Sequence, residues 1–272
     1  MTRLRHVIAI ALVSLAADFV AAPLSAATDP NGIGYAGKGQ LVVRTSIGGT
    51  GTEVTLGGDI ALEERGSFLR VDVLSLAIPG VDATISSLFS TQLFPPGGFT
   101  IVYDRSAGTY AVWSAAKHVY FTSARPANGE TPALPPQAPT AAALGAVGDL
   151  FGAFAVARPL KNDSAFTASV SLAGHGVVNG HPATALDYHY ARTTNGGEAI
   201  DIHGRLQLAD DLDAVPVEVT ASGKSNSFPQ SSLRLDLTTL TKMAIAGADL
   251  HVPADFMRVG DVGDVIGKSL GR

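Results

Sequence analysis

The most informative absence in this sequence is cysteine, which does not occur among its 272 residues. Without cysteine, the chain forms no disulfide, no thiolate metal site, no cysteine nucleophile and no lipid-modified N-terminal cysteine. Charged residues are also sparse, at 16% of the chain, and the formal net charge is −5. A mildly acidic chain disfavours nucleic acid as a partner. Because no disulfide can form, stability must come from a hydrophobic core, and a chain of this length is long enough to build one.

Long apolar runs are absent beyond the N-terminal segment, so we expect no membrane-spanning helix in the rest of the chain. Residues 1–27 have the pattern of a secretory signal, because a basic start with Arg3 and Arg5 precedes an apolar run and small residues around Ala26. Asp18 interrupts the apolar run, which argues against a retained anchor. We predict a periplasmic or secreted protein that is not an integral membrane protein. The alternative for this segment is a buried N-terminal helix of the domain.

The chain is rich in signals for strands and turns. It contains 30 glycines and 15 prolines, and apolar and polar residues alternate over many short stretches, as half-buried strands require. Gly32 to Gly37 has the spacing G-x-G-x-x-G of a dinucleotide site, but a strand does not precede it and a strand follows it, so we interpret it as a flexible lead-in. The predicted strands include residues 41–47, 54–62, 68–78, 99–103, 110–113, 117–122, 166–172, 186–190, 200–208, 215–221 and 233–237.

One segment, from Pro139 to Pro159, has the periodicity of a helix instead. Thr140 can cap its start, and its bulky residues recur on one side, which we call the helix stripe. A helix this apolar must be buried, and about 17 residues is short for a membrane span. We therefore place it against the concave side of a sheet. The helix stripe consists of Leu144, Val147, Leu150, Phe151 and Phe154.

These elements predict a mainly β fold. We expect an incomplete antiparallel β-barrel, that is, a curved sheet, with one apolar helix packed in its concave face. A single domain would span residues 28–260, and a flexible, glycine-rich tail would follow over residues 261–272.

The strands on either side of Asn195 permit a prediction of register. Directly opposed residues share a face, so only registers with even sums of residue numbers place Leu186 and Tyr188 against apolar residues of the next strand. A three-residue loop from Thr194 to Gly196 satisfies this condition, with Gly196 in the left-handed conformation.

The same register sets Asp187 opposite His203 and His189 opposite Asp201 on the polar face. Two histidines with carboxylates are suited to zinc binding or to acid–base chemistry. Cross-strand pairing on a solvated surface is the other interpretation, and we favour it because no further ligand or nucleophile accompanies the cluster. The sequence also lacks a P-loop, a G-x-S-x-G nucleophile elbow and an H-E-x-x-H motif. We therefore predict no catalytic residue, no metal site and no cofactor.

Three features of the C-terminal half resemble the LolA/LolB/RseB-like superfamily. They are the turn from Gly176 to Thr184 into a strand, the run Leu208 to Val217, and the closing segment Leu250 to Phe256. The resemblance implies an incomplete antiparallel barrel whose concave face is partly filled by helices, and a role in carrying or sensing lipoproteins. The chain departs from the family in a long proline-rich loop over residues 125–139, and the missing cysteine excludes a LolB-type lipoprotein.

Together these features predict a non-enzymatic, exported binding or carrier protein for a lipid, a lipoprotein acyl chain or another apolar ligand of the cell envelope. The helix stripe would form a movable wall of the binding space; the alternative is that it fills the core permanently. Two other classes stay open. One is a metal-dependent enzyme that uses the Asp/His cluster, and the other is a cell-envelope interaction module that offers a sheet edge or the proline-rich loop to a protein partner.

Overall fold

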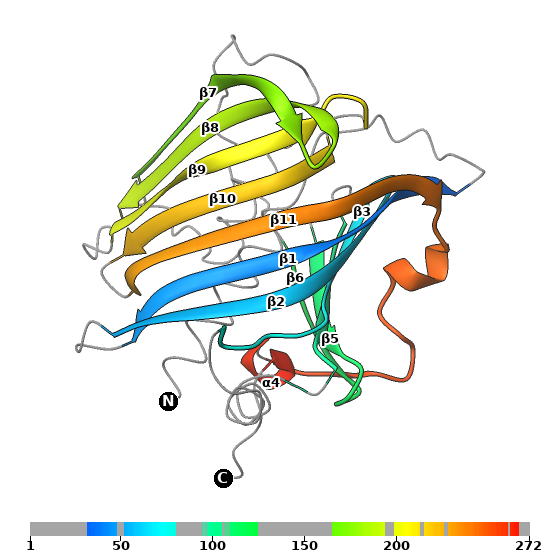
Figure 1. Cartoon of the computed structure of the whole chain (residues 1–272). Helices are drawn as coiled ribbons and strands as arrows, with labels where there is room; N and C mark the ends of the chain where they lie inside the picture. Colours follow the sequence, from blue (N-terminus) through cyan, green and yellow to red (C-terminus); the bar gives the residue numbers. More distant parts are fainter. Residues whose placement is uncertain are drawn as a thin grey trace.

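Twelve strands form one curved sheet in the computed structural model of this chain (Figure 1). The predicted secretory signal and the predicted helix from Pro139 to Pro159 lie outside the residues that the structure describes. Within the described residues, helical structure amounts to a 3₁₀ turn, η2 (Gly247–Leu250), and a short helix, α4 (Val262–Ile266). The prediction of a mainly β fold is confirmed. The described residues are 32–47, 52–79, 95, 97–104, 107, 109–124, 165–193, 199–212, 215–225, 228–260 and 262–266.

The order of strands in the sheet is β12-β6-β5-β4-β3-β2-β1-β11-β10-β9-β8-β7. Neighbouring strands are antiparallel, except that β12 runs parallel to β6. The first and last parts of the chain therefore meet in the middle of the sheet, where β1 pairs with β11. The strands are β1 (Ile33–Ile47), β2 (Thr52–Arg65), β3 (Phe68–Val73), β4 (Phe99–Asp104), β5 (Thr109–Ser114), β6 (Val119–Ala124), β7 (Ala165–Val178), β8 (His181–Thr193), β9 (Ala199–Ala209), β10 (Val215–Ser225), β11 (Phe228–Ala244) and β12 (Met257–Arg258).

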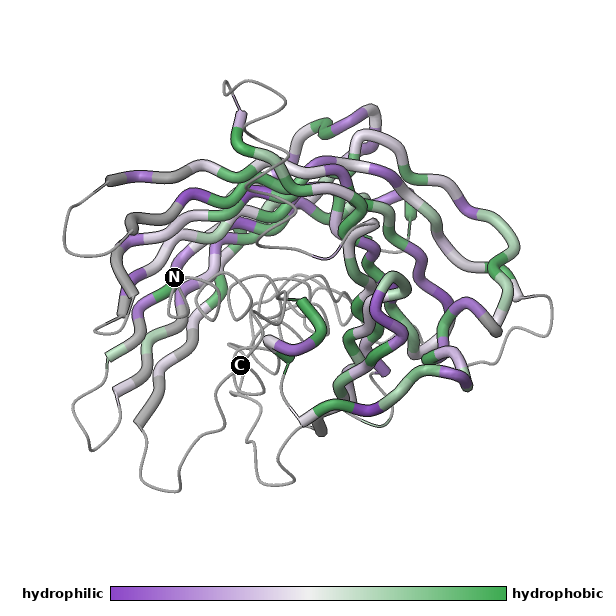
Figure 2. Tube along the Cα trace, turned by 90° about the horizontal axis from the view of Figure 1, so that it is seen from below, coloured by the Kyte–Doolittle hydropathy of each residue, from purple (hydrophilic) through white to green (hydrophobic). Residues whose placement is uncertain are grey.

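The sheet bends into an arch (Figure 2), and its two faces differ in chemistry. We call the concave side the inner face and the convex side the outer face. On β11, Leu233, Leu235 and Leu237 are buried on the inner face, whereas Arg234 and Asp236 lie between them on the outer face. Side chains alternate in this way because successive residues of a strand point to opposite faces. An antiparallel sheet with one buried and one solvated face produces this pattern.

The segment after β11 crosses from the outer face to the inner face around one edge of the sheet. We call residues 245–260 together with α4 the strap. It starts on the outer face, where Asp249 O accepts a hydrogen bond from Arg70 Nη1 at 2.7 Å and the ring of His251 meets the edge of Phe68 with centroids 5.1 Å apart. It then joins the sheet edge, where the backbone nitrogen of Met257 donates to His118 O at 2.9 Å.

The strap ends on the inner face with α4. Val265 and Ile266 are 0% and 2% exposed and belong to the same hydrophobic cluster as the inner-face residues of β5. Lys117 Nζ donates to Asp264 O at 2.8 Å and fixes the helix beside β6. The predicted tail over residues 261–272 therefore contains a docked helix in its described part.

Two sequence-based predictions about the first strands are wrong. The glycine-rich stretch from Gly32 is not a flexible lead-in, because β1 starts at Ile33 and pairs on both sides. Glycine is required within this stretch because a Cβ on Gly34 would lie 2.1 Å from Glu64 O of the neighbouring strand. The predicted strand over 68–78 ends at Val73; beyond it the chain returns to β2, where Ala77 N donates to Gly57 O at 2.7 Å.

Candidate ligand-binding face

The inner face of the sheet is apolar along most of the described strands. Its side chains come from strands on both sides of the β1–β11 junction and form one continuous cluster. Nearly all are aliphatic or aromatic, which suits contact with hydrocarbon. Among the described residues, the largest fully buried side chains are Ile60, Leu62, Leu69, Ile101, Leu186, Leu206, Leu208 and Leu237.

Two polar side chains interrupt this apolar face. Glu64 of β2 is 1% exposed and lies opposite Tyr35 of β1 in the strand register. Ser114, the last residue of β5, is 0% exposed and lies at the end of β5 that is farther from Glu64. A mainly apolar lining with a few fixed polar groups is the usual composition of a small-molecule site. The sequence pattern did not single out Glu64, because a glutamate at an inward position breaks the alternation that located the strand.

The five residues of the helix stripe, Leu144 to Phe154, lie outside the described residues. Their predicted place against the concave face stays a prediction. The part of the inner face that meets a described helix is the region of β5 and β6, where α4 packs.

The prediction for the hairpin of β8 and β9 was right about the faces and wrong about the register. Leu186 pairs with Leu206, so apolar residues do oppose apolar residues. The last pair before the loop is Thr193 with Ala199, which leaves five residues between the strands in place of three. The whole register is therefore shifted by two residues, a shift that preserves the faces because side chains alternate with period two.

The shift rearranges the predicted Asp/His cluster. His189 lies opposite His203, and Asp187 lies opposite Arg205. His189 Nε2 still reaches Asp201 Oδ1 diagonally, at 3.0 Å, but both side chains are about half exposed. Arg205 Nε donates to Asp187 Oδ1 at 2.6 Å, and this hydrogen bond holds the pKa of Asp187 below its ordinary value.

Arg205 thus occupies the carboxylate that a metal ion would need. Nowhere in the described part of the chain do three or more histidine, aspartate or glutamate side chains come together in a metal-binding arrangement. The contacts are those of cross-strand pairs on a solvated sheet, each of which contributes about 0.2–1 kcal/mol.

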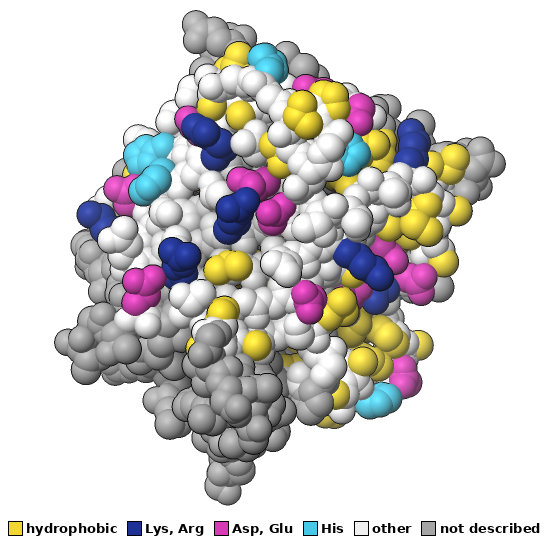
Figure 3. Space-filling view, viewed as in Figure 1, with side chains coloured by type: hydrophobic (Ala, Val, Ile, Leu, Met, Phe, Trp, Pro, Cys, Tyr) yellow, Lys and Arg dark blue, Asp and Glu magenta, His cyan; other side chains and the backbone are white. Residues whose placement is uncertain are grey.

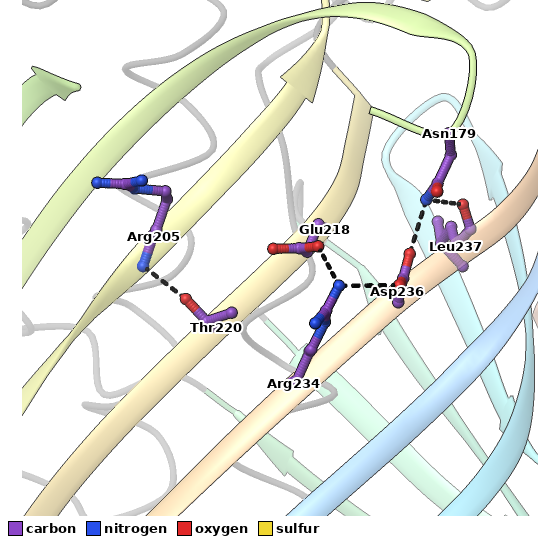
Figure 4. Close-up of polar contacts among 7 residues, drawn as sticks. All are labelled: Asn179, Arg205, Glu218, Thr220, Arg234, Asp236 and Leu237. Carbon is purple, nitrogen blue, oxygen red and sulfur yellow. Dashed lines mark hydrogen bonds and ion pairs between the residues drawn. The ribbon is translucent and has the colours of Figure 1, made fainter. Parts of the chain in front are cut away.

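Charges on the outer face are paired across strands in the same way. Figure 3 shows basic side chains beside acidic ones on this face, spread among other polar and small groups. In the close-up of Figure 4, Arg234 Nη2 donates to Glu218 Oε2 at 2.8 Å and to Asp236 Oδ2 at 3.2 Å. These side chains are partly exposed, so their ion pairs contribute little to stability. They keep the outer face compatible with water.

The tip of the β7–β8 hairpin is attached to a distant strand by its turn residue Asn179. Asn179 has φ 52°, in the left-handed region that an Asn-Gly turn requires. Its Nδ2 donates to Asp236 Oδ1 at 2.6 Å and to Leu237 O at 2.7 Å (Figure 4). The tip therefore curls past the β9–β10 turn and reaches β11.

His181 and Thr184 connect the same tip to the β9–β10 turn, and His175 supports Thr184. His181 Nδ1 lies 3.0 Å from Asp211 Oδ2. Thr184 Oγ1 donates a hydrogen bond to Asp210 Oδ1 at 2.7 Å and accepts one from His175 Nδ1 at 3.0 Å. Because the threonine hydroxyl donates to a carboxylate, it is not activated as a nucleophile by the histidine. Both histidines thus hold the hairpin tip in place.

Burial raises the pKa of Glu63 at the other end of the outer face, and the nearby Arg70 partly offsets this rise. Arg70 is itself bonded to Asp72, with Nε 3.0 Å from Oδ2. Thr100 Oγ1 donates to the other oxygen of Asp72. This polar group lies where η2 of the strap covers β3.

No helix among the described residues is long and apolar enough to cross a membrane.

Comparison with known proteins finds similar chains among the solved structures. No protein-family model matches the chain, and no curated protein matches it. A chain in the crystal structure of MucB is similar over 91% of this chain and 65% of its own length, with 16% identity and a TM-score of 0.30. This chain therefore spans less than two thirds of that protein. A likeness of this extent carries no argument about function, and the function proposed below rests on the sheet itself.

Proposed function

We propose that this protein is a non-enzymatic, exported carrier that binds an acyl chain or another apolar ligand against the inner face of its curved sheet. The observation that carries the proposal is the contrast between the two faces. The inner-face side chains form one continuous apolar cluster across the arch, whereas the outer face of β8 to β11 carries paired, partly exposed charges.

The energetics of this surface suit a hydrocarbon ligand. Transferring one CH₂ group from water to an apolar surface contributes about 0.8 kcal/mol, so a partly enclosed acyl chain is held by several kcal/mol. The residues of the helix stripe are the proposed movable wall on the opposite side.

The proposal is tested by ligand uptake. Purified protein is extracted with organic solvent, the extract is examined by mass spectrometry, and the delipidated protein is titrated with a fluorescent fatty acid. We expect co-purified lipid and saturable binding that unlabelled fatty acid displaces. Protein that releases no lipid and takes up no fluorescent fatty acid would contradict the carrier function.

Matched variants locate the site. Phe151→Asp and Phe154→Asp place a charge in the proposed wall and are expected to weaken fatty-acid binding at least about tenfold, because a buried charge costs more than the contact that it replaces. Ser232→Asp, on the outer face of β11 opposite Arg44 of β1, is the control and is expected to bind normally. Equal binding by all three variants would show that the wall lies elsewhere.

A further inference from the structure

In the described part of the chain, one edge of the sheet is covered and the other edge is not. At one edge, β12 pairs with β6 and the strap passes over it. At the other edge lies β7, which has 14 residues and no described strand beyond it. An uncovered edge presents a row of backbone N–H and C=O groups to any extended chain that approaches.

The usual devices that protect an edge strand are mostly missing from β7. Residues 165–178 contain no lysine, no other charged residue except the titratable His175, and no proline. A β-bulge between Leu172 and Gly174 is the one protective feature present in this strand. Two of its apolar side chains are turned to solvent, since Leu172 is 50% and Val177 is 74% exposed.

The edge is also held in a fixed shape. β7 pairs with β8 along its whole length, from Ala165 to Val178. Beyond the bulge, Asn179 fastens the hairpin tip to β11, as described above. The part of the edge before the bulge, residues 165–172, is therefore paired with β8 at every residue, and pairing with a further strand would cost little conformational freedom of β7 itself.

We propose that β7 pairs antiparallel with β7 of a second copy of this chain, which joins two sheets across a two-fold axis. A symmetric interface places every residue near the same residues of the other copy, so a charged strand would repel itself. The stretch 165–172 carries no charge and avoids this repulsion. Because β12 and the strap close the other edge, the assembly stops at two copies and does not extend into a fibre.

The faces of the two sheets restrict the register. Thr167, Ser169 and Ser171 are exposed on the outer face, and Val170 between them is buried on the inner face. Only registers with an even sum of residue numbers keep inner face beside inner face. Every such register places one residue of β7 directly opposite its own copy.

Single cysteines identify that residue, since the natural chain has no cysteine to interfere. Thr167→Cys, Ser169→Cys and Ser171→Cys are oxidised singly and as pairwise mixtures. Opposed residues of antiparallel strands have Cα atoms about 4.5–5.5 Å apart, within the range of a disulfide. We expect a disulfide-linked dimer at one position, or in one mixture, and little at the others. His203→Cys, exposed on the outer face of β9 away from the edge, is the control.

Sedimentation of the natural protein over a range of concentrations supplies the second measurement. We expect a monomer–dimer equilibrium without larger species. Ser169→Lys is expected to weaken the dimer about tenfold, because each copy brings one lysine to the symmetric interface and the two like charges repel. His203→Lys is expected to leave the dimer unchanged. Circular dichroism confirms that both variants are folded.

Three outcomes would overturn the proposal. They are a monomer at all concentrations, a dimer that is insensitive to Ser169→Lys, and cysteine variants of β7 that cross-link no better than His203→Cys. None of these measurements depends on lipid uptake, so failure of the edge pairing and failure of the carrier function are separate results.

Discussion

The two halves of the sheet reach the same inner face by different constructions. On one side of the β1–β11 junction, β3 to β6 have six residues each, and all five residues from Phe99 to Tyr103 are buried on both faces. On the other side, β7 to β11 have 11 to 17 residues and keep the outer face in water. Short strands need cover on both sides to bury enough surface, whereas long strands bury enough on one.

The difference teaches where each half obtains its stability. The short half depends on the strap, which covers its outer face at η2 and its inner face at α4. The long half depends on strand pairing and on aliphatic packing of a single face. Disturbing one source should therefore leave the other half largely intact, and the following experiments test that separation.

The largest effect is expected from Val265→Asp in α4. This change buries a carboxylate in the hydrophobic cluster, so we expect the free energy of unfolding to fall by about 3 kcal/mol. Hydrogen exchange should accelerate in β5 and β6 and stay slow in β8 to β10. Asp264→Asn, on the exposed side of the same helix, is the control. If hydrogen exchange accelerated equally in both halves of the sheet, the strap would stabilise both halves and not only the short one.

A smaller effect, in the long half, is expected from Gly204→Ala. A Cβ at this position would lie 1.9 Å from Thr220 O and 2.6 Å from Tyr188 Oη. The Tyr188 ring crosses the glycine so that its hydroxyl donates to Thr220 O at 3.0 Å. We expect a loss of about 2 kcal/mol from overpacking, measured by denaturant unfolding.

Tyr188→Phe is the matched variant for Gly204→Ala, because it removes only the hydroxyl and should cost about 1 kcal/mol. The two changes should be non-additive, since each disturbs the same ring. Additive losses would mean that Gly204 is needed for the backbone of β9 and not for the tyrosine.

The smallest effects are expected from pH, and they have opposite signs in the two halves. The pKa of Glu63 is raised above 4.5, so its favourable contribution is present below that value and is lost as the pH rises through the raised pKa. The pKa of Asp187 is lowered below 3.8, so its contribution is present above that value and is lost as the pH falls through the lowered pKa.

Thermal unfolding between about pH 2 and pH 7 separates the two groups. Relative to the natural protein, Glu63→Gln should gain stability as the pH rises above 4.5. Asp187→Asn should be less stable than the natural protein above pH 3.8, and this difference in stability should disappear as the pH falls below 3.8. Glu53→Gln, at an exposed position of β2, should follow the natural protein throughout. If Glu63→Gln lost stability relative to the natural protein as the pH rose, or if the stability difference of Asp187→Asn grew as the pH fell, the stated causes of the two pKa shifts would be wrong.

Strand positions were predictable from the sequence because burial on one face leaves a period-two pattern. The residues Leu233, Leu235 and Leu237 show that pattern without interruption. Register was less predictable, because the five-residue loop after Thr193 and the three-residue loop give the same faces. Local signals do not distinguish registers that differ by two.

The strap and the buried Glu64 were not predictable for a different reason. The strap has little alternation, since its residues meet the outer face, an edge and the inner face in succession, and its position depends on contacts with distant strands. The sequence motifs at Leu250 to Phe256 marked the segment without indicating that it crosses the edge. The candidate wall from Leu144 to Phe154 stays a prediction.

The pairing of β1 with β11 has a consequence for how this protein is made. Lys38 N bonds to Thr239 Oγ1 across 201 positions of sequence, so the central seam cannot close until β11 has left the ribosome. Until then β1 has a partner on one side only, and its second edge is open to incorrect pairing. Contacts between distant positions slow folding. A chaperone that retains the unfinished chain would therefore act at the stage before β11 arrives.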